Sequence, residues 1–226
     1  MQMKIVALLG FLLVVICSQA RPASGASDFQ LWSEVGLKYK LSKMFRFELD
    51  GLFRLEDNAS RMKSLAPEFS FTYRAFKFLR FRAGYRYAVK PEYTDGSPTY
   101  YSWHRFFFDV RLRYRLKPVT FKYRLRYQEQ FMVDNGFDSI YQHTLRNKLQ
   151  VEFNAGLGFE PFVAGELFIR FGDNDGLLHK WRATVGCDYQ YEAHQFSLFY
   201  RIQGMLNGSD EPALANILGI SYHYSF

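Results

Sequence analysis

Apolar and polar residues alternate with a period of two along most of this chain, most clearly at residues 105–116. One stripe of that segment consists of Phe106, Phe108, Val110, Leu112, Tyr114 and Leu116, and the other consists of Arg105, Phe107, Asp109, Arg111, Arg113 and Arg115. Similar pairs of stripes run through residues 45–56, 79–89 and 119–128. Because successive side chains of a strand point to opposite faces, the pattern predicts strands with one apolar and one polar face.

Two features favour a transmembrane antiparallel β-barrel over a secreted β-sandwich, whose strands also alternate. The apolar stripes run for about ten to twelve residues, longer than the usual strand of a globular protein. The polar stripes are dense in arginine on one strand after another. A membrane barrel satisfies both faces, because lipid covers the apolar side and a wet lumen takes the polar side. We therefore expect an all-β transmembrane barrel with a polar, arginine-rich lumen.

The connections between the expected strands alternate between short and long. Short turns are predicted at residues 42–43, 76–77, 117–118, 154–158 and 192–194, and longer loops at 57–63, 90–98, 133–139, 172–178 and 207–213. Since outer-membrane barrels have tight periplasmic turns and longer outside loops, the long set is expected to face the cell exterior. The strand segments number about eleven, but single-chain bacterial barrels are normally even-numbered. Ten or twelve strands are therefore expected, and twelve is preferred.

The N-terminus has the layout of a cleaved signal peptide rather than that of a membrane anchor. Lys4 precedes the apolar residues 5–17, which are too few to span a bilayer comfortably. Small residues follow, and cleavage is expected after Ala20 or Ala26. The predicted organisation is a signal peptide at 1–26 and a single barrel domain at 27–226, located in the bacterial outer membrane.

Composition adds little further chemistry. The formal net charge of +7 falls to +6 when Lys4 is removed, and to +5 if Arg21 is removed as well. Cys187 is then the only cysteine, and it cannot form an intramolecular disulfide. No Cys/His cluster has metal-ligand spacing, so no metal site and no cofactor are predicted. Basic and aromatic residues fall on opposite strand faces, which argues against a nucleic-acid partner.

The last segment of the chain is its most specific motif. Leu218, Ile220, Tyr222, Tyr224 and Phe226 form an apolar stripe that ends on the final residue. The stripe resembles the C-terminal signal by which the outer-membrane assembly machinery recognises its substrates. Tyr222, Tyr224 and Phe226 are the predicted assembly signal, and the assembly machinery and outer-membrane lipid are the predicted partners.

Several short motifs resemble an uncharacterised outer-membrane β-barrel family of unknown function that is common in Bacteroidota. They are Asp28-Phe29-Gln30-Leu31-Trp32, Asp57-Asn58-Ala59-Ser60-Arg61, Gly84-Tyr85-Arg86-Tyr87, the segments at 123–128 and 145–149, and the C-terminal ending. The resemblance covers nearly the whole chain after the signal peptide. It implies a location and a fold, and it implies no activity and no site.

The tight turns fix strand register, so facing residues of the lumen can be predicted. Around the turn at 117–118, Arg113 is expected opposite Lys122 and Arg111 opposite Arg124. The same reasoning predicts the pairs Asp109–Arg126, Arg74–Arg80 and Glu68–Arg86. Opposed like charges are unfavourable, so either bound anions or inward carboxylates must compensate. The carboxylates of inward parity are Glu48, Glu68, Asp109, Glu152, Glu166 and Asp188, and the candidate anion-attracting residues are Arg80, Arg82, Arg86, Arg111, Arg113, Lys122, Arg124 and Arg126.

Three functions are compatible with such a barrel. The first is a narrow, anion-biased passive channel, in which arginine offers a planar fork to a small anionic solute. The second is a structural or surface barrel whose lumen is closed by ion pairs. The third is a lipid hydrolase that uses Ser102 and His104 on the lipid face. These two residues lie about 6.6 Å apart along one strand, beyond the reach of a nucleophile and its base, so the chain is not expected to be an enzyme.

Overall fold

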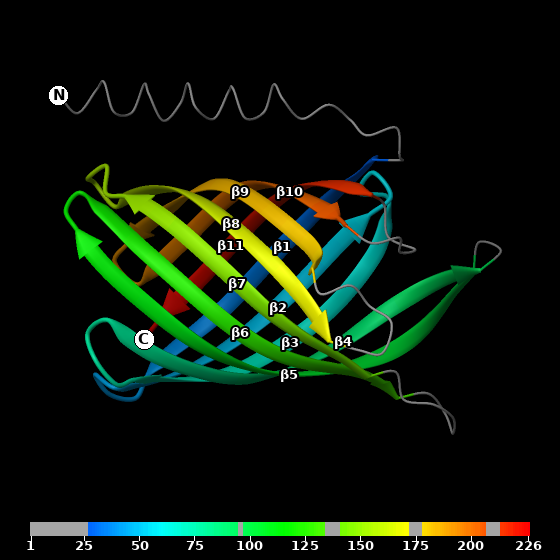
Figure 1. The fold of residues 1–226 in the computed structure, drawn as a ribbon, viewed down its shortest axis with the longest axis horizontal. Helices are drawn as coiled ribbons and strands as arrows, with labels where there is room; N and C mark the ends of the chain where they lie inside the picture. The colour runs from blue at the N-terminus through cyan, green and yellow to red at the C-terminus, as the bar shows by residue number, and fades with distance from the viewer. Residues whose placement is uncertain (1–26, 95–96, 134–140, 172–177, 207–212) are drawn as a thin grey trace.

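The computed structural model describes residues 27–94, 97–133, 141–171, 178–206 and 213–226. Over these residues the chain forms a closed barrel of eleven strands (Figure 1). The strands are β1 (Ser27–Lys40), β2 (Phe45–Glu56), β3 (Arg61–Arg74), β4 (Leu79–Thr94), β5 (Ser97–Leu116), β6 (Val119–Val133), β7 (Tyr141–Phe153), β8 (Phe159–Phe171), β9 (Leu178–Tyr191), β10 (His194–Met205) and β11 (Leu214–Ser225). The predicted all-β barrel is confirmed, and the predicted signal peptide lies outside the described residues.

Consecutive strands pair antiparallel in the register that the tight turns predict. Across the turn after β5, Arg113 lies opposite Lys122 and Arg111 lies opposite Arg124. The other predicted pairs also form, namely Asp109–Arg126, Arg74–Arg80 and Glu68–Arg86. The short connections at 41–44, 75–78, 117–118, 154–158 and 192–193 all lie at one end of the barrel, called the turn rim below.

The opposite end, called the loop rim, holds the connections that were expected to be long. Two of them are shorter than predicted. Residues 57–60 alone join β2 to β3, because Asp57, Asn58 and Ala59 make a tight turn with left-handed φ values of 55°, 56° and 61°. The strands β4 and β5 continue through most of the predicted loop at 90–98 and project beyond the barrel wall (Figure 1). The other three predicted loops lie largely outside the described residues.

The described barrel has eleven strands, within the expected range of ten to twelve, but the preference for an even count of twelve is wrong. The barrel closes where β1 pairs with β11, and these two strands are parallel. Ser27 pairs with Leu214 at the loop rim, and Lys38 pairs with Ser225 at the turn rim. An up-and-down barrel closed by an antiparallel seam needs an even number of strands, whereas a parallel seam accommodates an odd number. The described chain therefore begins at one rim and ends, at Phe226, at the other.

The two faces of the barrel wall differ as the alternation predicted. Outward side chains are mostly large and apolar and stay exposed, such as Leu198 at 58% and Phe69 at 50%. Aromatic rings follow one another along this outer face, as with Phe47 and Phe69, whose ring centroids lie 6.0 Å apart. Inward side chains are mostly polar and buried, and Asp109 is 0% exposed. None of the described residues belongs to a helix long and apolar enough to cross a membrane.

Candidate functional site in the barrel lumen

The eight predicted cations lie on the inward faces of three neighbouring strands. They are Arg80, Arg82 and Arg86 of β4, Arg111 and Arg113 of β5, and Lys122, Arg124 and Arg126 of β6. Six of them form an ion pair with a carboxylate. Arg80 and Arg113 have no such pair among the described residues. The predicted wall therefore exists in position, but carboxylates neutralise most of it.

Arg82 is the centre of the most densely paired part of the lumen. Its guanidinium lies 2.9 Å from Glu48, 3.3 Å from Asp50 and 3.2 Å from Glu68. Arg86 donates through Nε to Glu68 at 2.7 Å. All five side chains are buried. These residues, called the Arg82 cluster below, join β2, β3 and β4 through charged hydrogen bonds.

Two carboxylates hold further arginines on the next strands. Asp109 accepts hydrogen bonds from Arg126 at 2.6 Å and from Arg111 at 2.7 Å. Glu166 of β8 lies 2.6 Å from Arg124 of β6, so this pair spans β7. Glu166 also pairs with Arg146 and Arg182, and Glu152 pairs with Lys122. Of the two expected compensations, bound anions or inward carboxylates, the carboxylates supply it for these groups.

Asp188 is the exception among the predicted compensating carboxylates. No cation forms an ion pair with it among the described residues. Ser197 instead donates a hydrogen bond to its Oδ1 at 2.5 Å. Asp188 therefore makes no direct ion pair with the basic wall in the described part of the chain, although its charge lies near Lys122.

A cavity of about 650 Å³ lies inside the lumen. Among the described residues, its lining includes fourteen lysines and arginines but only five carboxylates. Arg54, Arg105, Lys148 and Arg201 line this cavity and form no ion pair with a described carboxylate. These four residues are called the unpaired cations below. The cavity therefore has positive charge that the carboxylates of its own lining do not balance.

Trp32 organises two of the unpaired cations. Its indole is 7% exposed and donates through Nε1 to Gln30 at 3.0 Å, which fixes the ring. The guanidinium carbon of Arg54 lies 4.1 Å from the ring centroid, and those of Arg201 and Arg182 each lie 5.2 Å away. When the flat face of a guanidinium packs on an aromatic ring, the N–H groups at the edge of the guanidinium can still bind a planar anion.

A second cavity, of about 260 Å³, lies nearer the turn rim. Its lining contains no carboxylate among the described residues. The cations that line it are Arg80, Arg111, Arg113, Lys122, Arg124 and Lys148. Arg124 and Lys148 line both cavities, so the cavities meet at these two side chains, and Glu166, which pairs with Arg124, lines the larger one.

Sequence reasoning missed Trp32 and the unpaired cations. Each of these side chains has the inward parity of its strand, so the alternation did contain a signal for its position. Parity does not show which cations lack a carboxylate, because the partners come from strands that are not neighbours. Arg124 and Glu166, on opposite sides of β7, are an example.

Polar side chains on the outer face pair with tyrosines. The hydroxyl of Tyr85 lies 2.7 Å from Nδ1 of His104, and that of Tyr87 lies 2.8 Å from Oγ of Ser102. Ser102 and His104 therefore do not form a nucleophile–base pair in this structure. That the chain is not an enzyme stays a prediction. Cys187 is half-buried and is the one cysteine among the described residues.

The predicted assembly signal lies on the outer face beside the seam. The N–H of Phe226 donates to the carbonyl of Lys38, and its own carbonyl accepts from Lys40, both at 3.0 Å. Its ring meets that of Tyr224 at a centroid distance of 5.3 Å. Phe226 thus extends the pairing with β1 by one residue beyond the end of β11. Recognition by the assembly machinery stays a prediction.

An apolar outer belt around a charged lumen defines the class of outer-membrane β-barrels, and solved structures of that class are similar to this chain. LpxR from Salmonella typhimurium has a TM-score of 0.52 and 10% identity, over 83% of this chain and 84% of that chain. The β-domain of the Bordetella autotransporter BrkA has a TM-score of 0.51 and 11% identity, over 83% of this chain and 86% of that chain. At these identities the likeness shows the fold alone.

This chain belongs to the family described as protein of unknown function (DUF2490), whose model matches residues 29–211. The predicted resemblance to an uncharacterised family is confirmed, and its abundance in Bacteroidota stays a prediction. A search of curated proteins finds no match. The family description names no activity, so a function has to be argued from the lumen itself.

Proposed function

We propose that this chain binds small anionic solutes inside its barrel and lets them pass through a narrow, anion-biased channel in the outer membrane. The proposal rests on one observation, the 650 Å³ cavity with its unpaired cations. Guanidinium groups stay charged and match carboxylate or phosphate with two parallel hydrogen bonds. An anion in this cavity would balance the positive charge of the unpaired cations, which the carboxylates of the lining do not balance.

The surroundings of the cavity strengthen its attraction for anions. A narrow lumen with low-dielectric walls focuses the field of its charged side chains and raises the local concentration of counter-ions. Arg80 and Arg113 extend the unbalanced charge toward the turn rim, where the second cavity lies. Cationic cavities that share Arg124 and Lys148 as a boundary give an anion successive binding positions along the barrel.

The alternative is a structural barrel that ion pairs keep closed. The pair between Arg124 and Glu166 favours it, because this bridge stands at the boundary between the two cavities. In that case the cavities hold anions as fixed counter-ions, and no current flows. The two functions therefore differ in conductance rather than in anion binding.

Planar-bilayer recordings of the purified, refolded protein test the channel. In a potassium chloride gradient, we expect current with a reversal potential that favours chloride over potassium. The preference should shrink at high salt, as the screening length falls to a few ångströms. A folded wild-type barrel that inserts and passes no current would refute the channel and support the closed barrel.

Two triple variants that remove the same number of positive charges test whether the chloride preference depends on the cavity or on the total charge of the protein. Changing Arg54, Arg105 and Arg201 together to Gln should reduce the chloride preference strongly. Changing Lys43, Lys77 and Lys117 to Gln removes the same number of charges from turns and should reduce it less. Equal effects of the two triple variants would show that the cavity has no special role.

For the cell, we propose an outer-membrane location, with residues 1–26 removed as a signal peptide and the loop rim facing outside. Lipid and the assembly machinery are the proposed partners, the latter through Tyr222, Tyr224 and Phe226. Deleting Phe226 should leave export across the inner membrane intact and strand the protein in the periplasm. Fractionation with immunoblotting measures this, and normal outer-membrane levels of the deletion variant would contradict the assembly signal.

A further inference from the structure

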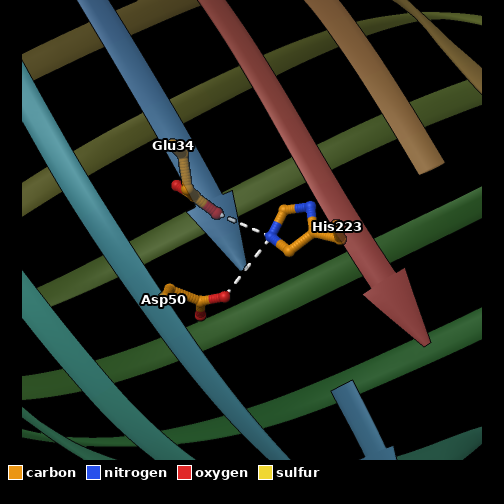
Figure 2. A group of neighbouring side chains, drawn as sticks. All are labelled: Glu34, Asp50 and His223. Atoms are coloured by element: carbon orange, nitrogen blue, oxygen red, sulfur yellow. Dashed lines mark hydrogen bonds and ion pairs between the residues drawn. The ribbon is translucent and has the colours of Figure 1, made fainter. Parts of the chain in front are cut away.

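Three potential metal ligands from three strands meet at the parallel seam. Nε2 of His223 in β11 lies 3.0 Å from Oε1 of Glu34 in β1 and 3.4 Å from Oδ1 of Asp50 in β2. All three ligand atoms lie within 4.8 Å of one another. Figure 2 shows the carboxylates of Glu34 and Asp50 both pointing toward the same ring nitrogen of His223.

Gly36 makes this convergence possible. It lies between the two partners in the sheet, opposite His223 on one side and Asp50 on the other. A Cβ at this position would come within 2.2 Å of Asp50 Oδ1 and 2.4 Å of His223 Cδ2. The missing side chain therefore provides the space in which Asp50 and His223 approach each other across β1.

The bonding of Asp50 leaves one oxygen available for a ligand. Arg82 donates to Oδ2 at 3.3 Å and so orients the carboxylate. Oδ1 is buried in a residue that is 5% exposed. It accepts no hydrogen bond, and Nε2 of His223 lies 3.4 Å from it. A buried carboxylate oxygen without a hydrogen bond is costly, and a bound cation beside it removes that cost.

We propose that Glu34, Asp50 and His223 bind a divalent transition-metal ion, with Zn²⁺ as the best match. Ligand atoms around a tetrahedral zinc at about 2.1 Å lie roughly 3.4 Å apart, close to the two distances from His223. One imidazole and two carboxylates suit zinc, and the two carboxylate charges balance those of the ion. No metal site was predicted from the sequence, where 189 positions separate Glu34 from His223.

The surroundings allow the ion to enter and give it a role. Glu34 and Asp50 both line the 650 Å³ cavity, so the site opens onto lumen water, and a water molecule can complete the coordination. The ion would connect β11, β1 and β2 at the place where the barrel closes. Its binding would therefore stabilise the closed seam over an opened barrel.

Isothermal titration of the refolded barrel with ZnCl₂ in detergent tests the site. We expect one saturable site per chain, and an excess of Mg²⁺ should not displace the zinc. His223→Gln removes a direct ligand, so it should weaken binding by at least the roughly tenfold that the loss of a residue behind a ligand costs. The control His104→Gln alters a histidine on the lipid face and should bind like the wild type. A change in gel mobility on heating checks that each variant is folded.

A measurement on the wild type makes the test independent of variants. X-ray absorption at the zinc edge of the loaded protein should show oxygen and nitrogen ligands that include a single imidazole. The site is refuted if the wild type binds no zinc at one per chain, or if folded His223→Gln binds it as tightly. It is equally refuted if the bound zinc has no imidazole ligand.

Discussion

The Arg82 cluster and the surroundings of Trp32 both hold buried guanidinium groups, but with different partners. In the Arg82 cluster, each buried guanidinium has a carboxylate within 3.3 Å. Around Trp32, Arg54 and Arg201 lie against an aromatic ring and have no carboxylate partner among the described residues. A ring can orient a guanidinium, but it does not neutralise the charge.

This difference separates cations that hold the wall together from cations that stay available. An arginine with its carboxylates in place stabilises the strands that supply them, and its charge is already matched. An arginine packed on an indole keeps hydrogen-bond donors and a full charge for a solute. Stability and anion binding should therefore respond to different substitutions, although all the residues are lumenal arginines.

The largest expected effect is on stability. Arg82→Gln leaves buried carboxylates without their shared partner and should lower the free energy of unfolding by about 3–5 kcal/mol. Arg201→Gln removes no ion pair and should change it by about 1 kcal/mol or less. Urea unfolding in lipid vesicles, followed by tryptophan fluorescence, measures both. Similar losses for the two variants would erase the distinction between the regions.

A smaller effect is expected from added anion. Phosphate at a hundred times its dissociation constant should raise the free energy of unfolding by about 2.7 kcal/mol, because it binds only the folded barrel. The gain should disappear in the double variant Arg54→Gln/Arg201→Gln. The control is Arg61→Gln, which changes an exposed side chain at the loop rim. This variant should still gain stability from phosphate. A similar gain in sodium chloride of the same ionic strength would indicate screening instead of binding.

The smallest effect should come from converting an unpaired cation into a paired one. Arg105 donates through Nε to Oε1 of Gln130 at 3.0 Å. Gln130→Glu puts a charged acceptor in the place of a neutral one and should raise the free energy of unfolding by up to about 1 kcal/mol. It should also reduce the chloride preference in bilayer recordings. The control Gln190→Glu adds the same charge near the turn rim. If it reduced the chloride preference as much as Gln130→Glu does, pairing with Arg105 would not be the cause.

The strands and their facing residues could be predicted because both follow from local rules. Alternation sets which side chains point inward, and a two-residue turn then fixes the partner of every residue on the hairpin. Arg111 opposite Arg124 follows from the turn at 117–118 in this way. The tight turn at 57–60 was missed because left-handed backbone at Ala59 is rare outside glycine, asparagine and aspartate.

The closure of the barrel and most of the site could not be predicted in this way. Which strand meets β1 depends on the size and shear of the whole barrel, and no turn joins β1 to β11. The approach of His223 to Glu34 is a result of that closure. The stacking of Arg201 of β10 on Trp32 of β1 also crosses the seam, which explains why inward parity alone did not reveal it.

The parallel seam has a consequence for redesigning the chain. Circular permutation joins the two ends of a folded domain and opens new ones, and it works best where the ends are neighbours. Here Ser27 is at the loop rim and Phe226 is at the turn rim, because β1 and β11 run in the same direction. A linker that joins them must run the length of a strand, which takes at least about a dozen extended residues. If lipid covers the outer face, as we propose, an irregular linker cannot run along it. It would have to pass through the lumen, past the same cations that we propose bind anions.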